Sequence, residues 1–251
     1  MKQITLRQQN KRLVFLLIPV TLFAIAMGFL ESAVVVYLRE IYYPEGFSFP
    51  LKNLEAPVTY TEFFREVATL VMLVSVAWLI ARAWIVRFAW FIYLFAIWDI
   101  FYYIFLWLLL GWPESLLTWD ILFLIPTIWV GPVLAPVINS CTMILLAMVI
   151  IRAGIRHEQV RLTGLAWGFL IAGALITILA YIQGYSRYMQ EQFSLAEWVG
   201  SSNQTEVMAH AARYVPGDFN WLLFLTGTGL FVLAILQVIR RNFTGFNKDR
   251  V

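Results

Sequence analysis

The sequence predicts an all-α integral membrane protein, a bundle of six transmembrane helices with its N- and C-termini in the cytoplasm. Composition, the length of the apolar runs and the placement of basic residues together predict it. Of the 251 residues, 61% are hydrophobic and 13% are charged, and the mean hydropathy is +0.77. Soluble domains carry about 25% charged residues. Because this chain has too little polar surface to cover its apolar residues in water, lipid must surround most of it.

The predicted spans form a single polytopic, multi-pass membrane domain. A helix needs about 20 apolar residues to cross the hydrocarbon, and five runs meet that length, while a sixth exceeds it. No segment alternates polar and apolar residues as the strands of a transmembrane barrel do. The predicted spans are residues 13–38, 60–80, 88–111, 117–151, 162–183 and 219–239, with an outer loop at 184–218.

The fourth region, residues 117–151, does not fit a single straight helix. Residues 121–151 carry no charge, and these 31 residues would extend about 46 Å as a helix, against about 30 Å of hydrocarbon. Pro126 and two later prolines can bend or break the chain. We therefore expect residues 116–129 to form a separate entry segment, such as a re-entrant one. Asp120 through Pro126 should then lie near the outer surface.

Basic residues concentrate on one side of the predicted bundle. With the N-terminus inside, cytoplasmic segments hold 13 of the 18 Lys and Arg residues but only two acids, Glu158 and Asp249, as the positive-inside rule requires. Because these residues are spread over four segments, they predict topology and no nucleic-acid partner. The expected location is the bacterial cytoplasmic (inner) membrane. The thirteen are Lys2, Arg7, Lys11, Arg12, Arg82, Arg87, Arg152, Arg156, Arg161, Arg240, Arg241, Lys248 and Arg250.

Ionisable residues inside the predicted spans mark the candidate site, because a charge in hydrocarbon costs several kcal/mol. Glu31, Glu66 and Asp99 come from three different spans and lie at the midplane or in the outer half, as the helical rise places them. The polar side chains in the inner halves of the spans are only amides and hydroxyls. This asymmetry predicts an outward-opening pocket on which the three carboxyl groups converge. They would serve there as catalytic acid/base groups or as cation ligands.

Five further residues are predicted to bind the substrate in this pocket. Arg65 follows Glu62 by three residues on the same helix face, so it can pair with that acid or hold an anionic headgroup. Tyr102 and Tyr103 follow the acid of the third span by three and four residues and can hydrogen-bond along its face. Asp120 opens the fourth region near the outer surface. A purely structural Glu62–Arg65 pair is the alternative.

These residues leave three classes of function open. The first is a membrane-embedded enzyme or binding protein that acts on a lipidic or small cationic ligand by acid/base or carboxylate–metal chemistry. Proton-initiated isoprenoid chemistry is a special case of it. The second is a small ion- or proton-coupled transporter, although no inverted repeat is evident. The third is a non-catalytic subunit of a membrane complex or oligomer. No nucleotide, zinc-protease or hydrolase motif occurs, so the sequence assigns neither a cofactor nor a metal.

One small-residue motif predicts a close helix contact. Gly164 and Gly168 are four residues apart in the fifth span, and this spacing lets two helix backbones approach each other in lipid. We expect a contact within the bundle rather than a dimer interface.

Overall fold

Six helices in the described part of the chain are long and apolar enough to cross a membrane, as expected of a multi-pass membrane protein. The computed structural model describes residues 6–52, 54–124, 127–156, 160, 162–194, 197–198 and 204–244, and the protein is 76% helical. A π-helical turn, η2 (Arg240–Thr244), follows the last helix. The six helices are α1 (Leu6–Tyr42), α2 (Ala56–Ile80), α3 (Trp84–Leu110), α4 (Leu134–Arg156), α5 (Gly164–Gln190) and α8 (Trp221–Ile239).

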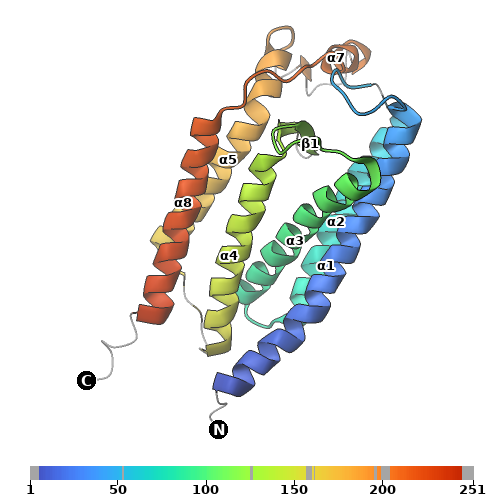
Figure 1. Cartoon of the computed structure of the whole chain (residues 1–251). Coiled ribbons are helices and arrows are strands. Elements are labelled where there is room, and N and C mark those ends of the chain that lie inside the picture. The colour runs from blue at the N-terminus through green and yellow to red at the C-terminus, as the bar shows by residue number, and fades with distance from the viewer. Residues whose placement is uncertain are drawn as a thin grey trace.

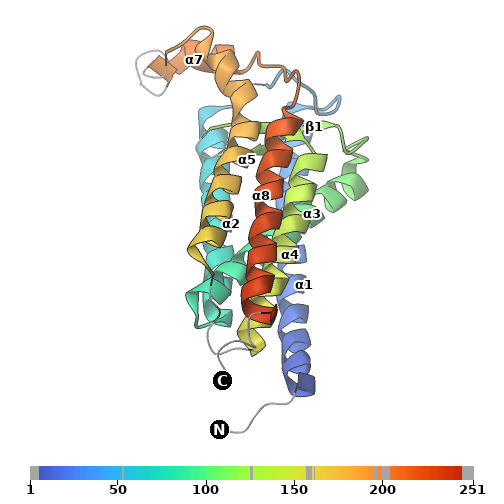
Figure 2. The same cartoon turned by 90° about the vertical axis from the view of Figure 1, so that its left-hand side faces the viewer.

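The helices stand side by side, with the start of α1 and the end of α8 at the same end of the bundle (Figure 1). We call this the terminal end. The opposite, hairpin end carries the α1–α2 connection, a two-stranded hairpin and the short helix α7 (Gln204–Ala211). Helix α3 packs against α1, α2 and α4, while α5 and α8 form a pair that joins the rest through α4 and the hairpin. Figure 2 shows this pair from the side.

The fourth region was predicted not to be one straight helix, and this is confirmed. The segment before α4 forms a β-hairpin, however, so the all-α prediction is wrong here. Strands β1 (Trp119–Phe123) and β2 (Trp129–Pro132) pair antiparallel, and Asp120 lies opposite Gly131. Trp119, Ile121 and Phe123 of β1 and Trp129 and Val130 of β2 are aromatic or β-branched, as suits a half-buried pleated surface. Helix α4 then begins at Leu134. Pro126 lies outside the described residues.

Local signals explain where several helices begin and end. The side chain of Thr163 accepts a hydrogen bond from the backbone N–H of Ala166 at the start of α5, and Asn220 does the same for Leu223 at the start of α8. Such caps satisfy N–H groups that the helix itself leaves unpaired. Gly111 ends α3 in the left-handed conformation, with φ 65°, which glycine adopts without steric cost.

The close contact predicted from glycines occurs at different residues. A Cβ at Gly164 or Gly168 would meet no atom within 4 Å, so neither glycine mediates a close contact. Helices α5 and α8 instead approach through Gly173 and Gly227. A Cβ at Gly227 would lie 2.3 Å from Thr177 Oγ1 and 2.9 Å from the Gly173 carbonyl oxygen. The principle of small residues at helix contacts holds, but the sequence motif pointed to the wrong turns of α5.

Candidate functional site

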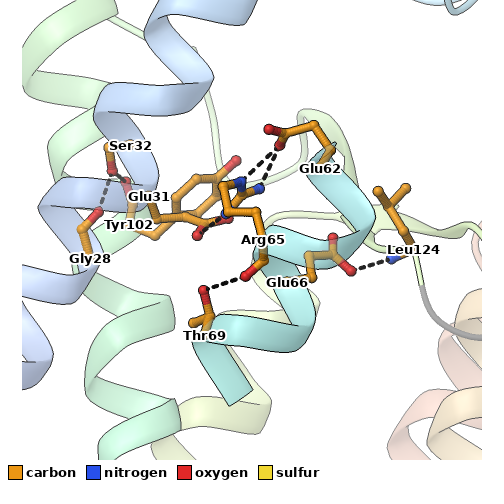
Figure 3. Close-up of polar contacts among 9 residues, drawn as sticks. All are labelled: Gly28, Glu31, Ser32, Glu62, Arg65, Glu66, Thr69, Tyr102 and Leu124. Carbon is orange, nitrogen blue, oxygen red and sulfur yellow. Dashed lines mark hydrogen bonds and ion pairs between the residues drawn. The ribbon is translucent and has the colours of Figure 1, made fainter. Parts of the chain in front are cut away.

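Arg65 joins two helices through two carboxylates (Figure 3). Its Nε and Nη2 atoms donate to Glu62 Oε2, one turn earlier in α2, at 2.9 and 2.7 Å. Its Nη1 atom forms an ion pair with Glu31 Oε2 of α1. The predicted Glu62–Arg65 pair is therefore present, and Glu31 completes it from the neighbouring helix. Because the Arg65 side chain is only 21% exposed, water screens these pairs less than it screens surface pairs.

Glu66 is the next residue along α2, yet its side chain points away from Arg65 (Figure 3). Its Oε2 atom accepts a hydrogen bond from the backbone N–H of Leu124, just after β1, at 3.3 Å. The residue is 9% exposed. Its charge interacts with those of Arg65, Glu31 and Glu62. We call Glu31, Glu62, Arg65 and Glu66 the carboxylate cluster: it holds three acids and one guanidinium.

Asp99 lies at a different helix interface. Its Oδ2 atom accepts a hydrogen bond from Ser140 Oγ of α4 at 2.8 Å. This contact turns the carboxyl group toward α4, whereas the carboxylate cluster lies between α1, α2 and the hairpin. The charges of Glu31 and Glu66 are thus close enough to interact, whereas Asp99 takes part in a separate contact between α3 and α4. Asp99 was predicted to share one outward-opening pocket with Glu31 and Glu66, but its hydrogen bond is directed to α4 instead of the carboxylate cluster.

Asp120 and Tyr103 belong to a third group of contacts, at the hairpin end. Arg39 Nη2 of α1 lies 3.6 Å from Asp120 Oδ1, and the Tyr103 hydroxyl donates to Asp120 Oδ2 at 3.2 Å. The Arg39 guanidinium also lies over the rings of Trp112 and Phe47, with its Cζ 3.7 and 4.6 Å from their centroids. Burial raises the pKa of Asp120 to about 6, although the positive charge of Arg39 opposes this rise.

Tyr102 interacts electrostatically with charged residues of both ionic groups, namely Arg39 and Asp120 of one and Glu31 and Arg65 of the other. Its backbone carbonyl accepts a hydrogen bond from Ser32 Oγ of α1 at 3.0 Å, and Figure 3 shows the ring beside the cluster. Its position therefore suits the binding role predicted for it.

Glycine allows α1 to approach α3 closely beside this tyrosine. A Cβ at Gly28 would lie 3.0 Å from the Trp98 carbonyl oxygen and 3.1 Å from the Tyr102 nitrogen. Ser32, one turn later, also donates to the Gly28 carbonyl at 2.8 Å. The backbone of α1 is thereby fixed against α3, and this sets the position of Glu31, three residues after Gly28. Sequence reasoning did not single out either residue, because neither carries a charge.

The donor set of the carboxylate cluster limits its chemistry. Within the described ranges, no three His, Cys, Asp or Glu side chains are grouped as metal ligands would be. The cluster does carry more negative than positive charge. Carboxylates in such a place can accept a proton or pair with an organic cation. The arrangement therefore suits acid/base chemistry or cation binding.

Comparison with known proteins identifies no relative from which a function could be inferred. No protein-family model matches the chain, and no curated protein or solved structure shows significant similarity to it.

Proposed function

We propose that the chain is a membrane-embedded binding protein or enzyme that takes a small cationic or lipidic ligand at the carboxylate cluster. Glu66 would receive the ligand's positive charge, or exchange a proton with it. One observation carries the proposal: Arg65 is shared between Glu31 and Glu62, whereas the buried carboxyl group of Glu66 accepts a single hydrogen bond from the described residues, from the backbone N–H of Leu124 at 3.3 Å.

The energetic argument rests on the balance of charge. A buried carboxylate that lacks a partner costs several kcal/mol. Two guanidinium contacts offset this cost for Glu31 and Glu62, but Glu66 receives a weaker, neutral donor. A bound cation or proton would offset it for Glu66. The Tyr102 ring of α3, beside the cluster in Figure 3, adds an aromatic face of the kind that attracts organic cations.

We further propose that the hairpin end faces outside, in the bacterial cytoplasmic membrane, so that the ligand enters from the outer side. At the terminal end, Arg82 lies between α2 and α3, Arg87 lies in the first turn of α3 and Arg156 ends α4, and the positive-inside rule assigns such basic residues to the cytoplasm. Glu66 lies ten residues after the start of α2, which is about 15 Å along the helix from the hairpin end. A ligand could reach this depth without crossing the whole bilayer.

A second candidate has its own supporting observation. Each acid bonds a different element: Glu31 bonds α2, Glu66 bonds the hairpin and Asp99 bonds α4. Such bonds would hold the bundle together in a non-catalytic subunit of a membrane complex. A proton-coupled transporter would use the same groups with access from both sides. The experiment must therefore separate binding from folding.

Binding of an organic cation to the purified protein tests the proposal. We suggest thermal unfolding in detergent with choline, tetraethylammonium or ethanolamine, and with 3,3-dimethyl-1-butanol as the uncharged analogue of choline. At least one cation should raise the melting temperature of the wild type, whereas the alcohol should not. Glu66→Gln should abolish the rise, and Glu114→Gln, at an exposed acid outside the cluster, should keep it. A wild type that responds to none of the cations would favour the subunit.

A further inference from the structure

A second group of polar side chains lies beneath the hairpin, between α4 and α5, apart from the carboxylate cluster. Trp129 of β2 stacks on Tyr181 of α5, with ring centroids 5.7 Å apart and planes 20° from parallel. Asn139 Nδ2 of α4 donates to the Tyr181 hydroxyl at 3.0 Å. Apolar residues surround the three, including Ala135 and Phe224. Three elements thus bring polar groups to one tyrosine in an apolar setting.

Two atoms of this group are buried and have no hydrogen-bond partner among the described residues: Trp129 Nε1 and Asn139 Oδ1. A buried polar atom without a partner is costly. Because Nδ2 of the Asn139 amide bonds the Tyr181 hydroxyl, the atom left unpaired is the amide oxygen, which can only accept. The indole nitrogen can only donate. The site therefore offers one donor and one acceptor.

We propose that Trp129, Asn139 and Tyr181 form a binding site for a hydroxyl group, either of a water molecule or of a neutral lipid. A hydroxyl group can accept from the indole N–H and donate to the amide oxygen at the same time. A cation such as an ammonium group cannot accept the indole hydrogen bond. A carboxylate cannot donate to the amide oxygen. The donor and acceptor pattern thus selects a neutral hydroxyl, in contrast to the cation proposed at the carboxylate cluster.

The surroundings of the site fit this ligand. A cavity of about 10 Å³ also borders Tyr181, lined by Trp119, Val130 and Phe219 but not by Trp129 or Asn139, and this volume is about the least that holds one water molecule. One water molecule thus has room beside Tyr181. Ser140, next to Asn139 on α4, donates to Asp99, whose charge interacts with Tyr181. The hydroxyl site therefore adjoins Asp99, and it does not depend on the function proposed for Glu66.

Nuclear magnetic resonance of the indole groups in the whole protein tests the site directly. The tryptophans are labelled with ¹⁵N in perdeuterated detergent, and Trp129→Phe identifies the signal of Trp129 by its loss. Trp98 is the matched reference, because its Nε1 atom is also buried without a partner but lies in the apolar core. The Trp129 indole proton should resonate downfield of the Trp98 proton and move upfield in Asn139→Leu.

The source of the hydroxyl follows from the neighbours of that proton. A nuclear Overhauser effect to water assigns a bound water, and one to lipid glycerol protons assigns a lipid hydroxyl. Both results support the site. A Trp129 indole proton at the position of Trp98, or one that Asn139→Leu leaves unchanged, overturns it. The comparison with Trp98 and the Overhauser effects are both measured in the wild-type protein, so these two readouts do not depend on how well Asn139→Leu folds.

Discussion

Arg39 and Asp120 form an ion pair that is almost fully buried at the hairpin end, with side chains 9% and 3% exposed and 3.6 Å between Nη2 and Oδ1. The pair joins the end of α1 to β1. Trp112, just after α3, covers the guanidinium. Three elements distant in the sequence therefore depend on one cation.

We expect Arg39→Gln to destabilise the protein by roughly 3–5 kcal/mol at pH 8, because it leaves the charge of Asp120 buried without a partner. The loss should be smaller at pH 5, where the carboxyl group can take up a proton. Unfolding in a denaturing detergent, followed by tryptophan fluorescence, measures both values. Lys52→Gln, at an exposed cation of the same end, is the control. Equal losses for the two variants would show that the pair contributes nothing.

The wild type should lose stability relative to Asp120→Asn as pH rises from about 4 to 7. Burial raises the pKa of Asp120 from 3.8 to about 6, so the folded state binds this proton more tightly than the unfolded state does. The resulting stability is fully present below pH 3.8 and is lost as pH passes through 6. It amounts to at most about 3 kcal/mol. Arg39 and Tyr103 face the carboxyl group and are the same in both proteins.

Unfolding of both proteins at matched pH values measures this difference. The variant corrects for every other titrating group, because only position 120 differs. If the wild type instead gained stability relative to Asp120→Asn over this range, Arg39 would outweigh burial and the pKa of Asp120 would be lowered.

Gly227→Ala should destabilise the contact between α5 and α8 by about 1–3 kcal/mol, the usual cost of overpacking. The new Cβ would lie 2.3 Å from Thr177 Oγ1, so the helices would have to separate. Gly229→Ala is a matched control on the same helix, since a Cβ there meets no atom within 4 Å. The control should be neutral or slightly stabilising, as alanine favours helices. Equal melting temperatures for the two variants would contradict the close contact.

Sequence reasoning identified the elements that depend on local chemistry. The long apolar runs predicted the six helices, and the three-residue spacing predicted the Glu62–Arg65 pair. The excess length of the fourth region predicted a break before α4. The form of the break was not predicted, because a short apolar run reads equally well as a strand or as part of a buried helix.

The missed features depend on how the helices are turned about their axes. A sequence gives the depth of Asp99 but not the helix that it faces, so its bond to Ser140 could not be foreseen. The ion pair of Arg39 with Asp120 was also not predicted, because it depends on the direction in which the end of α1 presents this side chain. The glycines that mediate contacts likewise follow from tertiary packing.

Amide substitutions at Glu66 and at Glu31 should separate ligand binding from structural support. In Glu66→Gln, the amide oxygen can still accept from the N–H of Leu124, and a buried charge without a cationic partner is removed, so the fold should be at least as stable as the wild type. Affinity for an organic cation should fall at least tenfold, or about 1.4 kcal/mol. In Glu31→Gln, the ion pair that joins α1 to Arg65 is lost. That variant should unfold at a lower temperature, because a half-buried guanidinium loses one of its two anions.

Melting temperatures and choline titrations of both variants give the two readouts. If Glu66→Gln instead unfolded as readily as Glu31→Gln, the bond of Glu66 to the hairpin would be its main role. The chain would then be better explained as a structural subunit whose acids hold the helices together.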